Sequence, residues 1–315
     1  MSPRIAIALA LFLAPSIRAG EDRPAVWMMP PAAPDGSCLR ELFTHPEQWQ
    51  ATRARIAGIG YADHTLHKQF TDEELRDWLP KLDGWGLKLA LEVGAVKPWG
   101  TTGQATFRAE RPMWDRFRRL GAKLDAFAMD EPLVSARNDL KKPDAYAVEE
   151  TAEFIALVRQ YDPAIRIGDV EPYPSIPRAD LIAWIDALQA SLARKNVRGL
   201  DFFRVDVDWV HFVMGHPGGW REVQQIEAAC RARKLPFSLI YWAADYPHLK
   251  RRDLADDATW YISVMRQGHD YALVDGKPDE YVIESWVGAP SRAVPEDNAW
   301  TFTRSVLDFS RRFVK

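Results

Sequence analysis

Long apolar runs, clusters of one charge sign and low-complexity segments are all missing from this sequence. The longest apolar stretch, residues 5–14, covers about ten residues, which is too short to span a bilayer. The chain is mildly acidic, with a formal net charge of −3, and contains no tract of lysine or arginine. We therefore expect no membrane and no nucleic acid among its partners. Because no long polar linker interrupts the chain, we expect a single domain.

The N-terminal residues 1–19 have the pattern of a secretory signal peptide. Arg4 supplies the positive charge, residues 5–14 the apolar core, and Ile17-Arg18-Ala19 a cleavage site with small residues. No cysteine follows that site, so a lipid anchor is not expected. These features predict a secreted or periplasmic protein whose mature domain covers residues 20–315.

From Arg23 onwards, short apolar runs alternate with amphipathic helical patterns. The eight runs cover residues 25–29, 56–61, 87–96, 126–129, 165–170, 200–207, 236–242 and 281–286. Eight strands separated by helices predict an α/β fold, a single (β/α)8 TIM barrel. The main alternative is a doubly wound open sheet. That fold usually needs a glycine-rich turn after its first strand, where this chain has Pro30 and Pro31.

Local signals add two expectations about helix starts. Thr44 with Glu47, and Thr71 with Glu74, have the spacing of capping boxes. A further helix is expected over residues 111–124. In such a barrel the two cysteines, Cys38 and Cys230, lie near opposite ends. An exported protein can form disulfides, but this separation favours Cys230 as a buried thiol.

The fourth run ends in two adjacent carboxylates, Asp130 and Glu131, followed by Pro132. The proline ends the strand and biases Glu131 towards extended geometry. In a barrel, this carboxyl end of a strand is where a general acid or a nucleophile lies. The alternative interpretation is that the two carboxylates only cap the next helix or pair with an arginine.

Carboxylates follow seven of the eight predicted strands, and aromatic residues follow four of them. The residues at these ends are Trp27, Asp63, His64, Glu92, Asp130, Glu131, Asp169, Glu171, Asp206, Asp208, Trp209, Trp242, Asp245, Glu284 and Trp286. Alternation along the sixth strand places Arg204, Asp206 and Asp208 on the interior face. One interpretation is that Arg204 simply pairs with Asp206 or Asp169. One arginine cannot neutralise so many acids, and crowding raises carboxyl pKa values, which keeps a glutamic acid protonated.

The tryptophans indicate the ligand. Of the thirteen, six fall at strand ends or in the loops after them: Trp27, Trp99, Trp209, Trp220, Trp242 and Trp286. The other seven fall on predicted helices and are interpreted as core. Flat apolar rings beside carboxylates suit a sugar, whose C–H face stacks while its hydroxyls bond to the acids. We expect a carbohydrate substrate, no cofactor, no metal and a monomeric protein.

Two short motifs resemble glycoside hydrolases of the (β/α)8 superfamily. Asp130-Glu131-Pro132 resembles the Asn-Glu-Pro that carries the acid/base of the large clan of retaining glycosidases. Ser285-Trp286 resembles that clan's terminal-strand tryptophan, which forms the floor of the sugar subsite. The resemblance implies a secreted hydrolase of glycosidic bonds with Glu131 as general acid.

The second catalytic carboxylate is less clearly marked. The clan has a glutamate at the end of strand 7, whereas residues 240–245 contain only Asp245. We choose Glu171, because it closes the adjacent strand and precedes a proline, as Glu131 does. Neighbouring strands suit the close carboxylates of a retaining pair, while Asp206, two strands away, suits the wider inverting pair. The expected substrate-binding residues are Asp130, Asp206, Asp208, Trp242, Glu284 and Trp286.

Two rival functions stay open. A metal-dependent hydrolase would draw its ligands from His64, His67, Asp206, Asp208, His211 and His216. Barrel metallohydrolases usually present His-x-His on strand 1, which has no histidine here. The other rival is a carbohydrate-binding barrel without catalysis, in which the acids only accept hydrogen bonds from hydroxyls.

Overall fold

The computed structural model describes residues 23–208, 211–212, 214–243 and 256–315. The predicted signal peptide, Trp209 and Asp245 lie outside the described residues.

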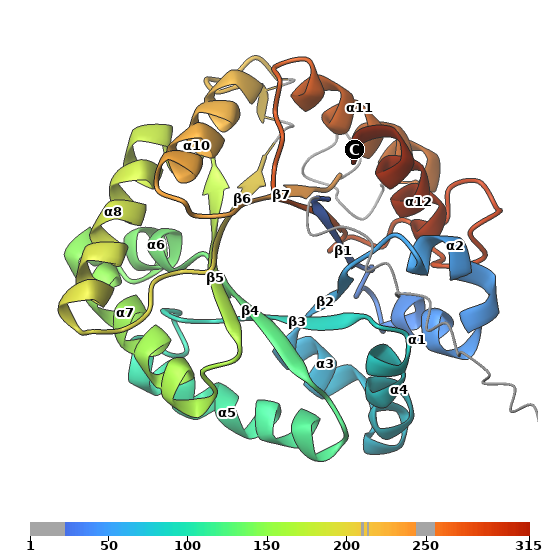
Figure 1. Cartoon of the computed structure of the whole chain (residues 1–315), viewed down its shortest axis with the longest axis horizontal. Helices are drawn as coiled ribbons and strands as arrows, with labels where there is room; N and C mark the ends of the chain where they lie inside the picture. Colours follow the sequence, from blue (N-terminus) through green and yellow to red (C-terminus); the bar gives the residue numbers. More distant parts are fainter. Residues whose placement is uncertain (1–22, 209–210, 213, 244–255) are drawn as a thin grey trace, which may run out of the picture.

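Eight parallel strands close into one barrel in sequence order. Figure 1 shows the barrel at the centre of the molecule. They are β1 (Ala25–Met29), β2 (Gly58–Ala62), β3 (Lys88–Val93), β4 (Leu124–Asp130), β5 (Arg166–Tyr173), β6 (Phe202–Val207), β7 (Phe237–Tyr241) and β8 (Glu280–Glu284). Every apolar run in the sequence contributes a strand, because strands of a parallel barrel are covered on both faces. The predicted TIM barrel is confirmed.

Helices surround the barrel and cover the outer faces of the strands (Figure 1). They are α1 (Ser37–Thr44), η1 (Pro46–Trp49), α2 (Gln50–Arg53), α3 (Asp63–Gln69), α4 (Asp72–Gly84), α5 (Gly103–Arg119), α6 (Pro132–Val134), η2 (Ser135–Asp139), α7 (Asp144–Tyr161), α8 (Arg178–Arg194), α10 (Trp220–Ala232), α11 (Asp257–Ala272) and α12 (Phe302–Phe313). Among the described helices, none combines the length and the apolar character needed to cross a membrane.

The two predicted capping boxes have opposite outcomes. The hydroxyl of Thr71 accepts the N–H of Glu74, and the Glu74 carboxylate accepts the N–H of Thr71, so this box is confirmed. The box at Thr44 is wrong. Thr44 is the last residue of α1, and its hydroxyl donates to the carbonyl of Arg40 at 2.8 Å. The helix expected over 111–124 begins earlier, because Thr102 caps α5 through the N–H of Ala105.

Strand register decides which side chains reach the barrel interior. Glu280 is in register with Ser238, which is in register with Arg204. The guanidinium of Arg204 donates to the Ser238 hydroxyl at 2.9 Å and lies 3.6 Å from the Glu280 carboxylate. The interpretation that Arg204 pairs with Asp206 or Asp169 is therefore wrong. Its partner Glu280 belongs to the lower layer of the barrel. Among the described residues, no arginine is bonded to the carboxylates at the barrel mouth.

Both cysteines are buried and unpaired. The Cys38 thiol donates a hydrogen bond to the Pro290 carbonyl, with Sγ 3.6 Å from the oxygen. Cys230 is a buried residue of α10. The prediction of a buried Cys230 thiol rather than a disulfide is confirmed.

Candidate active site

Two adjoining hollows open at the carboxyl ends of the strands. The first, here called the acidic cavity, has a volume of about 360 Å³. Its lining comprises Glu92, Asp130, Glu131, Val170, Pro172, Ser175, Asp206, Asp208, Ile240, Trp242, Glu284 and Trp286. The structure thus brings together all the expected substrate-binding residues and Glu131.

Glu131 occupies an unusual backbone position directly after β4. Its φ and ψ are 49° and 50°, the left-handed region, so the expected extended geometry is wrong. Pro132 biases the residue before it towards extended geometry, and the contacts of Glu131 in the folded chain override that bias. The Glu131 N–H donates to the Val170 carbonyl at 3.0 Å, which continues the β4–β5 ladder by one residue. The backbone then turns sharply into α6, which leaves the half-buried carboxyl beside the cavity.

The surroundings of Glu131 favour its protonated form. Burial and then the neighbouring Asp130 raise the pKa of Glu131 to about 7, against the lowering effect of Lys97. Lys97, in the loop after β3, forms an ion pair with Asp130. Burial lowers the pKa of Lys97, but the Asp130 carboxylate outweighs it and the pKa is raised. A carboxyl group with a pKa near neutrality suits general-acid work.

Asp206 and Glu284 form the acidic floor of the cavity. Burial, followed by Glu131 and Glu284, raises the pKa of Asp206 well above its usual range. Burial also raises the pKa of Glu284 to about 7, although Arg204 lowers it. Asp206 Oδ1 and Glu284 Oε2 are buried and have no hydrogen-bond partner among the described residues. Orphaned oxygens at the floor of a cavity are positioned to bind ligand hydroxyls.

Trp242 and Trp286 supply the aromatic wall. Their rings lie 4.3 Å apart at 40° and both line the acidic cavity. The indole N–H of Trp242 donates to the Val207 carbonyl at 2.9 Å, which fixes the ring against β6. Trp286 is half-buried, so part of its ring is available to a ligand.

Glu171 does not reach either cavity. Its side chain is fully buried, and its two oxygens accept the N–H groups of Leu133 at 2.6 Å and Val134 at 3.3 Å. Asp169, two residues earlier on β5, likewise faces the helices and accepts the indole N–H of Trp184. The expectation that Glu171 leans over the barrel mouth is therefore wrong, because alternation along β5 turns it towards α6.

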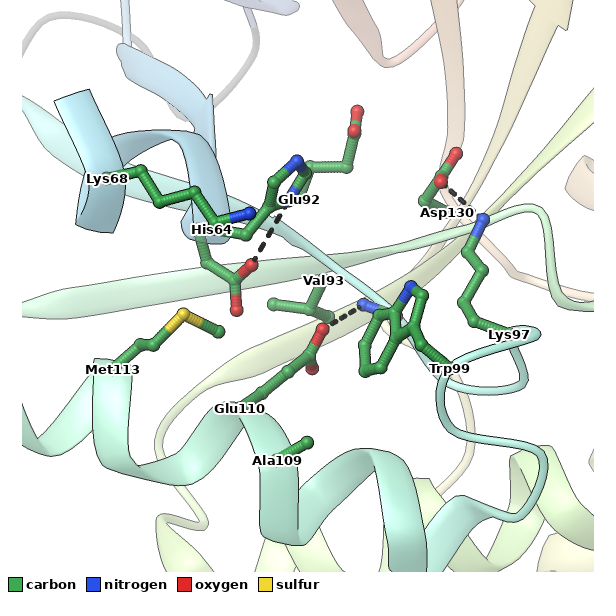
Figure 2. Close-up of a pocket in the computed structure, with 12 residues that line it drawn as sticks. His64, Lys68, Glu92, Val93, Lys97, Trp99, Ala109, Glu110, Met113 and Asp130 are labelled. Atoms are coloured by element: carbon green, nitrogen blue, oxygen red, sulfur yellow. Dashed lines mark hydrogen bonds and ion pairs between the residues drawn. The ribbon is translucent and has the colours of Figure 1, made fainter.

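The second hollow, here called the side cavity, has a volume of about 520 Å³ and lies between β3, α3 and α5 (Figure 2). It is lined by Asp63, His64, Lys68, Glu92, Val93, Gly94, Lys97, Trp99, Ala109, Glu110, Met113 and Asp130. Sequence reasoning assigned no site here, although Glu110 gave a usable signal. It lies on the buried stripe of α5 with Thr106 and Trp114, where a charged residue is unusual.

The candidate metal ligands are not gathered into a site within the described residues. The rings of His211 and His216 pack at a tilt with their centroids 4.3 Å apart. His64 Nδ1 lies 3.8 Å from Asp63 Oδ1. Across the described ranges, no group of three or more histidine, cysteine, aspartate or glutamate side chains is arranged to hold a metal ion.

Comparisons with known proteins agree with the barrel. No protein-family model and no curated protein matches the chain. An endoxylanase of family GH10 from a sugarcane soil metagenome matches with a TM-score of 0.54 and 8% identity, over 91% of this chain and 97% of that chain. A xylanase A variant from P. fluorescens subsp. cellulosa, in complex with xylopentaose, matches with a TM-score of 0.52 and 11% identity, over 91% and 97%.

A thermostable mutant of the xylanase Xyn10A from Cellvibrio japonicus matches with a TM-score of 0.51 and 13% identity, over 84% of this chain and 86% of that chain. Barrel proteins of other chemistry, among them an aldolase and an aldo-keto reductase, match as well. At these identities the likeness shows the (β/α)8 fold and nothing finer.

Proposed function

We propose that this protein is a glycoside hydrolase in which Glu131 is the general acid. The observation that carries the proposal is the position of Glu131. It ends a barrel strand, lines a cavity with two tryptophans, and has a pKa raised to about 7 by burial and by Asp130. Its proton passes to the oxygen of the leaving sugar as the bond from that oxygen to the anomeric carbon breaks.

Asp206 is the proposed partner carboxylate. It lines the same cavity as Glu131, and its Oδ1 has no hydrogen-bond partner among the described residues. Strand β6 is two strands from β4. The carboxyl groups of Glu131 and Asp206 therefore suit the wider separation of an inverting pair, which admits a water molecule between them and the sugar. That water bonds to the anomeric carbon and gives its proton to Asp206, so the configuration is inverted. The enclosure of the Glu171 carboxylate by backbone amides supports this choice over Glu171.

Glu284, Asp208, Asp130 and the two tryptophans are assigned to substrate binding. The ring of a sugar stacks on Trp286, and its hydroxyls reach the free oxygen of Glu284. We further propose that the enzyme acts outside the cytoplasm, as the leader pattern predicts, and works as a monomer on carbohydrate without metal or cofactor.

Turnover tests the proposal directly. The purified protein is incubated with plant and bacterial polysaccharides and with aryl glycosides, and released reducing ends are counted. Turnover that is lost in Glu131→Gln and kept in Glu73→Gln, an exposed glutamate on α4, supports it. Binding of sugars without any turnover would favour a carbohydrate-binding barrel instead.

A further inference from the structure

The side cavity and the acidic cavity adjoin. Glu92 and Asp130 line both of them, so a ligand long enough to extend past these two side chains would occupy both. Of the two, the side cavity is the larger, at about 520 Å³ against about 360 Å³. This volume is larger than a single water molecule requires. The proposed hydrolysis at Glu131 and Asp206 does not account for it.

Trp99 forms one wall of the side cavity. Its side chain is 58% exposed, which is high for a tryptophan. The N–H and carbonyl groups of Lys97 and Gly100 bond to each other at 3.0 and 2.9 Å, so a tight turn holds the indole. The ring lies against Gly94, where a Cβ would come within 3.0 Å of it. The six-membered ring of the indole therefore packs against backbone.

Glu110 lies beside that indole, as Figure 2 shows. Its side chain is 2% exposed, Oε1 accepts the N–H of Gly94 at 2.7 Å, and Oε2 has no hydrogen-bond partner among the described residues. Burial and the nearby Asp63 raise the pKa of Glu110 well above its usual range. Glu110 lines the side cavity, and a buried acid with one unsatisfied oxygen needs a polar partner.

We propose that the side cavity is a second sugar subsite, in which a neutral sugar unit stacks on Trp99 and bonds through a hydroxyl to Glu110. The inference rests on the proposed glycosidase function and narrows its substrate to an oligosaccharide or polysaccharide. The chain of sugars runs from Trp286, past Glu131 and Asp130, to Trp99. Lys97, which lines the side cavity, is already paired with Asp130, so its charge is not available to an acidic sugar.

Binding measurements on a catalytically silent background test this inference. In the Glu131→Gln protein, affinities are measured by calorimetry for β-1,4-linked oligomers of xylose, glucose and mannose, from one to six units. Along the series, affinity is expected to increase at the oligomer length whose added sugar unit enters the side cavity. Trp99→Ala should remove about tenfold of that gain, or about 1.4 kcal/mol.

The matched control for Trp99 is Trp300→Ala. Trp300 is also exposed, at 41%, but it packs edge-on against Tyr261 of α11, away from both cavities. This variant should bind every oligomer like the parent. Glu110→Gln should keep most of the affinity gain, because an amide can still accept from Gly94 and donate into the cavity. Glu110→Leu should lose that gain, and Trp99→Ala provides the same test if this core variant does not fold.

The outcomes separate this inference from the proposed function. If Trp99→Ala binds long and short oligomers with the parent's affinities, the side cavity is not a subsite, while the hydrolase assignment stands. If the affinity gain appears only for oligomers that carry uronic acids, the neutral-sugar assignment is overturned. If no oligomer binds and the native enzyme turns over none, the glycosidase function itself fails.

Discussion

The Glu171 carboxylate accepts the backbone N–H of Leu133 at 2.6 Å, two residues after Glu131. Its second oxygen holds the N–H of Val134 at 3.3 Å, so one buried side chain fixes the start of α6. These amides belong to a short helix that follows the catalytic candidate without a linker. We therefore propose that Glu171 is a positioning residue for Glu131.

Glu171→Gln tests this role. The amide keeps one acceptor oxygen but presents an N–H₂ group to the second backbone amide. We expect a loss of stability of about 1–3 kcal/mol and a fall in kcat that exceeds the change in KM. The pH dependence of kcat should also move, because the Glu131 carboxyl is displaced. A different result would contradict us: rescue of Glu171→Ala by azide, with a glycosyl azide of retained configuration, would identify Glu171 as the nucleophile.

The second prediction concerns the pH profile. A general acid must be protonated, so activity should fall as the pH rises through about 7, the raised pKa of Glu131. Glu131→Gln should lose about 10²–10⁴-fold in rate on substrates with poor leaving groups. The rate of this variant should also no longer fall as the pH rises through about 7; this fall is the alkaline limb of the pH profile. Rates on nitrophenyl glycosides, which need little protonation, should fall much less.

The third prediction uses Lys97. Its positive charge lowers the pKa of Glu131 and pairs with Asp130, so removal of that charge should raise the Glu131 pKa. Lys97→Met should therefore move the alkaline limb to higher pH. Lys88→Met, at the exposed amino end of the same strand β3, is the control and should leave the limb in place. A limb that stays fixed in Lys97→Met would remove Glu131 from the acid role.

The fourth prediction concerns stereochemistry. If Asp206 activates water, the first product seen by NMR is the inverted anomer, and Asp206→Asn is inactive. Asp169→Asn is the matched control, because Asp169 is also buried but faces α8 through Trp184. A retained product would exclude this pairing.

The fifth prediction concerns stability. The folded-state pKa of Glu284 is about 7, above its ordinary value of 4.5, so the folded state holds this proton more tightly. The stabilising effect is complete below the unfolded pKa and is lost as pH rises through 7. Glu284→Gln should therefore have a higher Tm than the parent at pH 8 and little advantage at pH 4. The exposed variant Glu73→Gln should follow the parent at both pH values.

The barrel was predictable because its strands are short apolar runs buried on both faces. The interior position of Asp206 also followed from alternation, and the same rule applied to β5 would have turned Glu171 outwards, since Val170 is in register with Asp130. The left-handed turn at Glu131 and the loop that presents Trp99 were not predictable. Their conformations depend on tertiary contacts with Val170 and Gly94, which no local pattern encodes.

Because Glu131 has a positive φ, selection for stability and selection for function should favour different residues at this position. A side chain in the left-handed region is strained, and glycine or asparagine relieves that strain. A library randomised at position 131 and selected only for heat resistance should therefore enrich glycine and asparagine. The same library selected for growth on the substrate should return glutamate. The difference between the two populations shows whether position 131 is kept for its carboxyl group at the expense of folding stability.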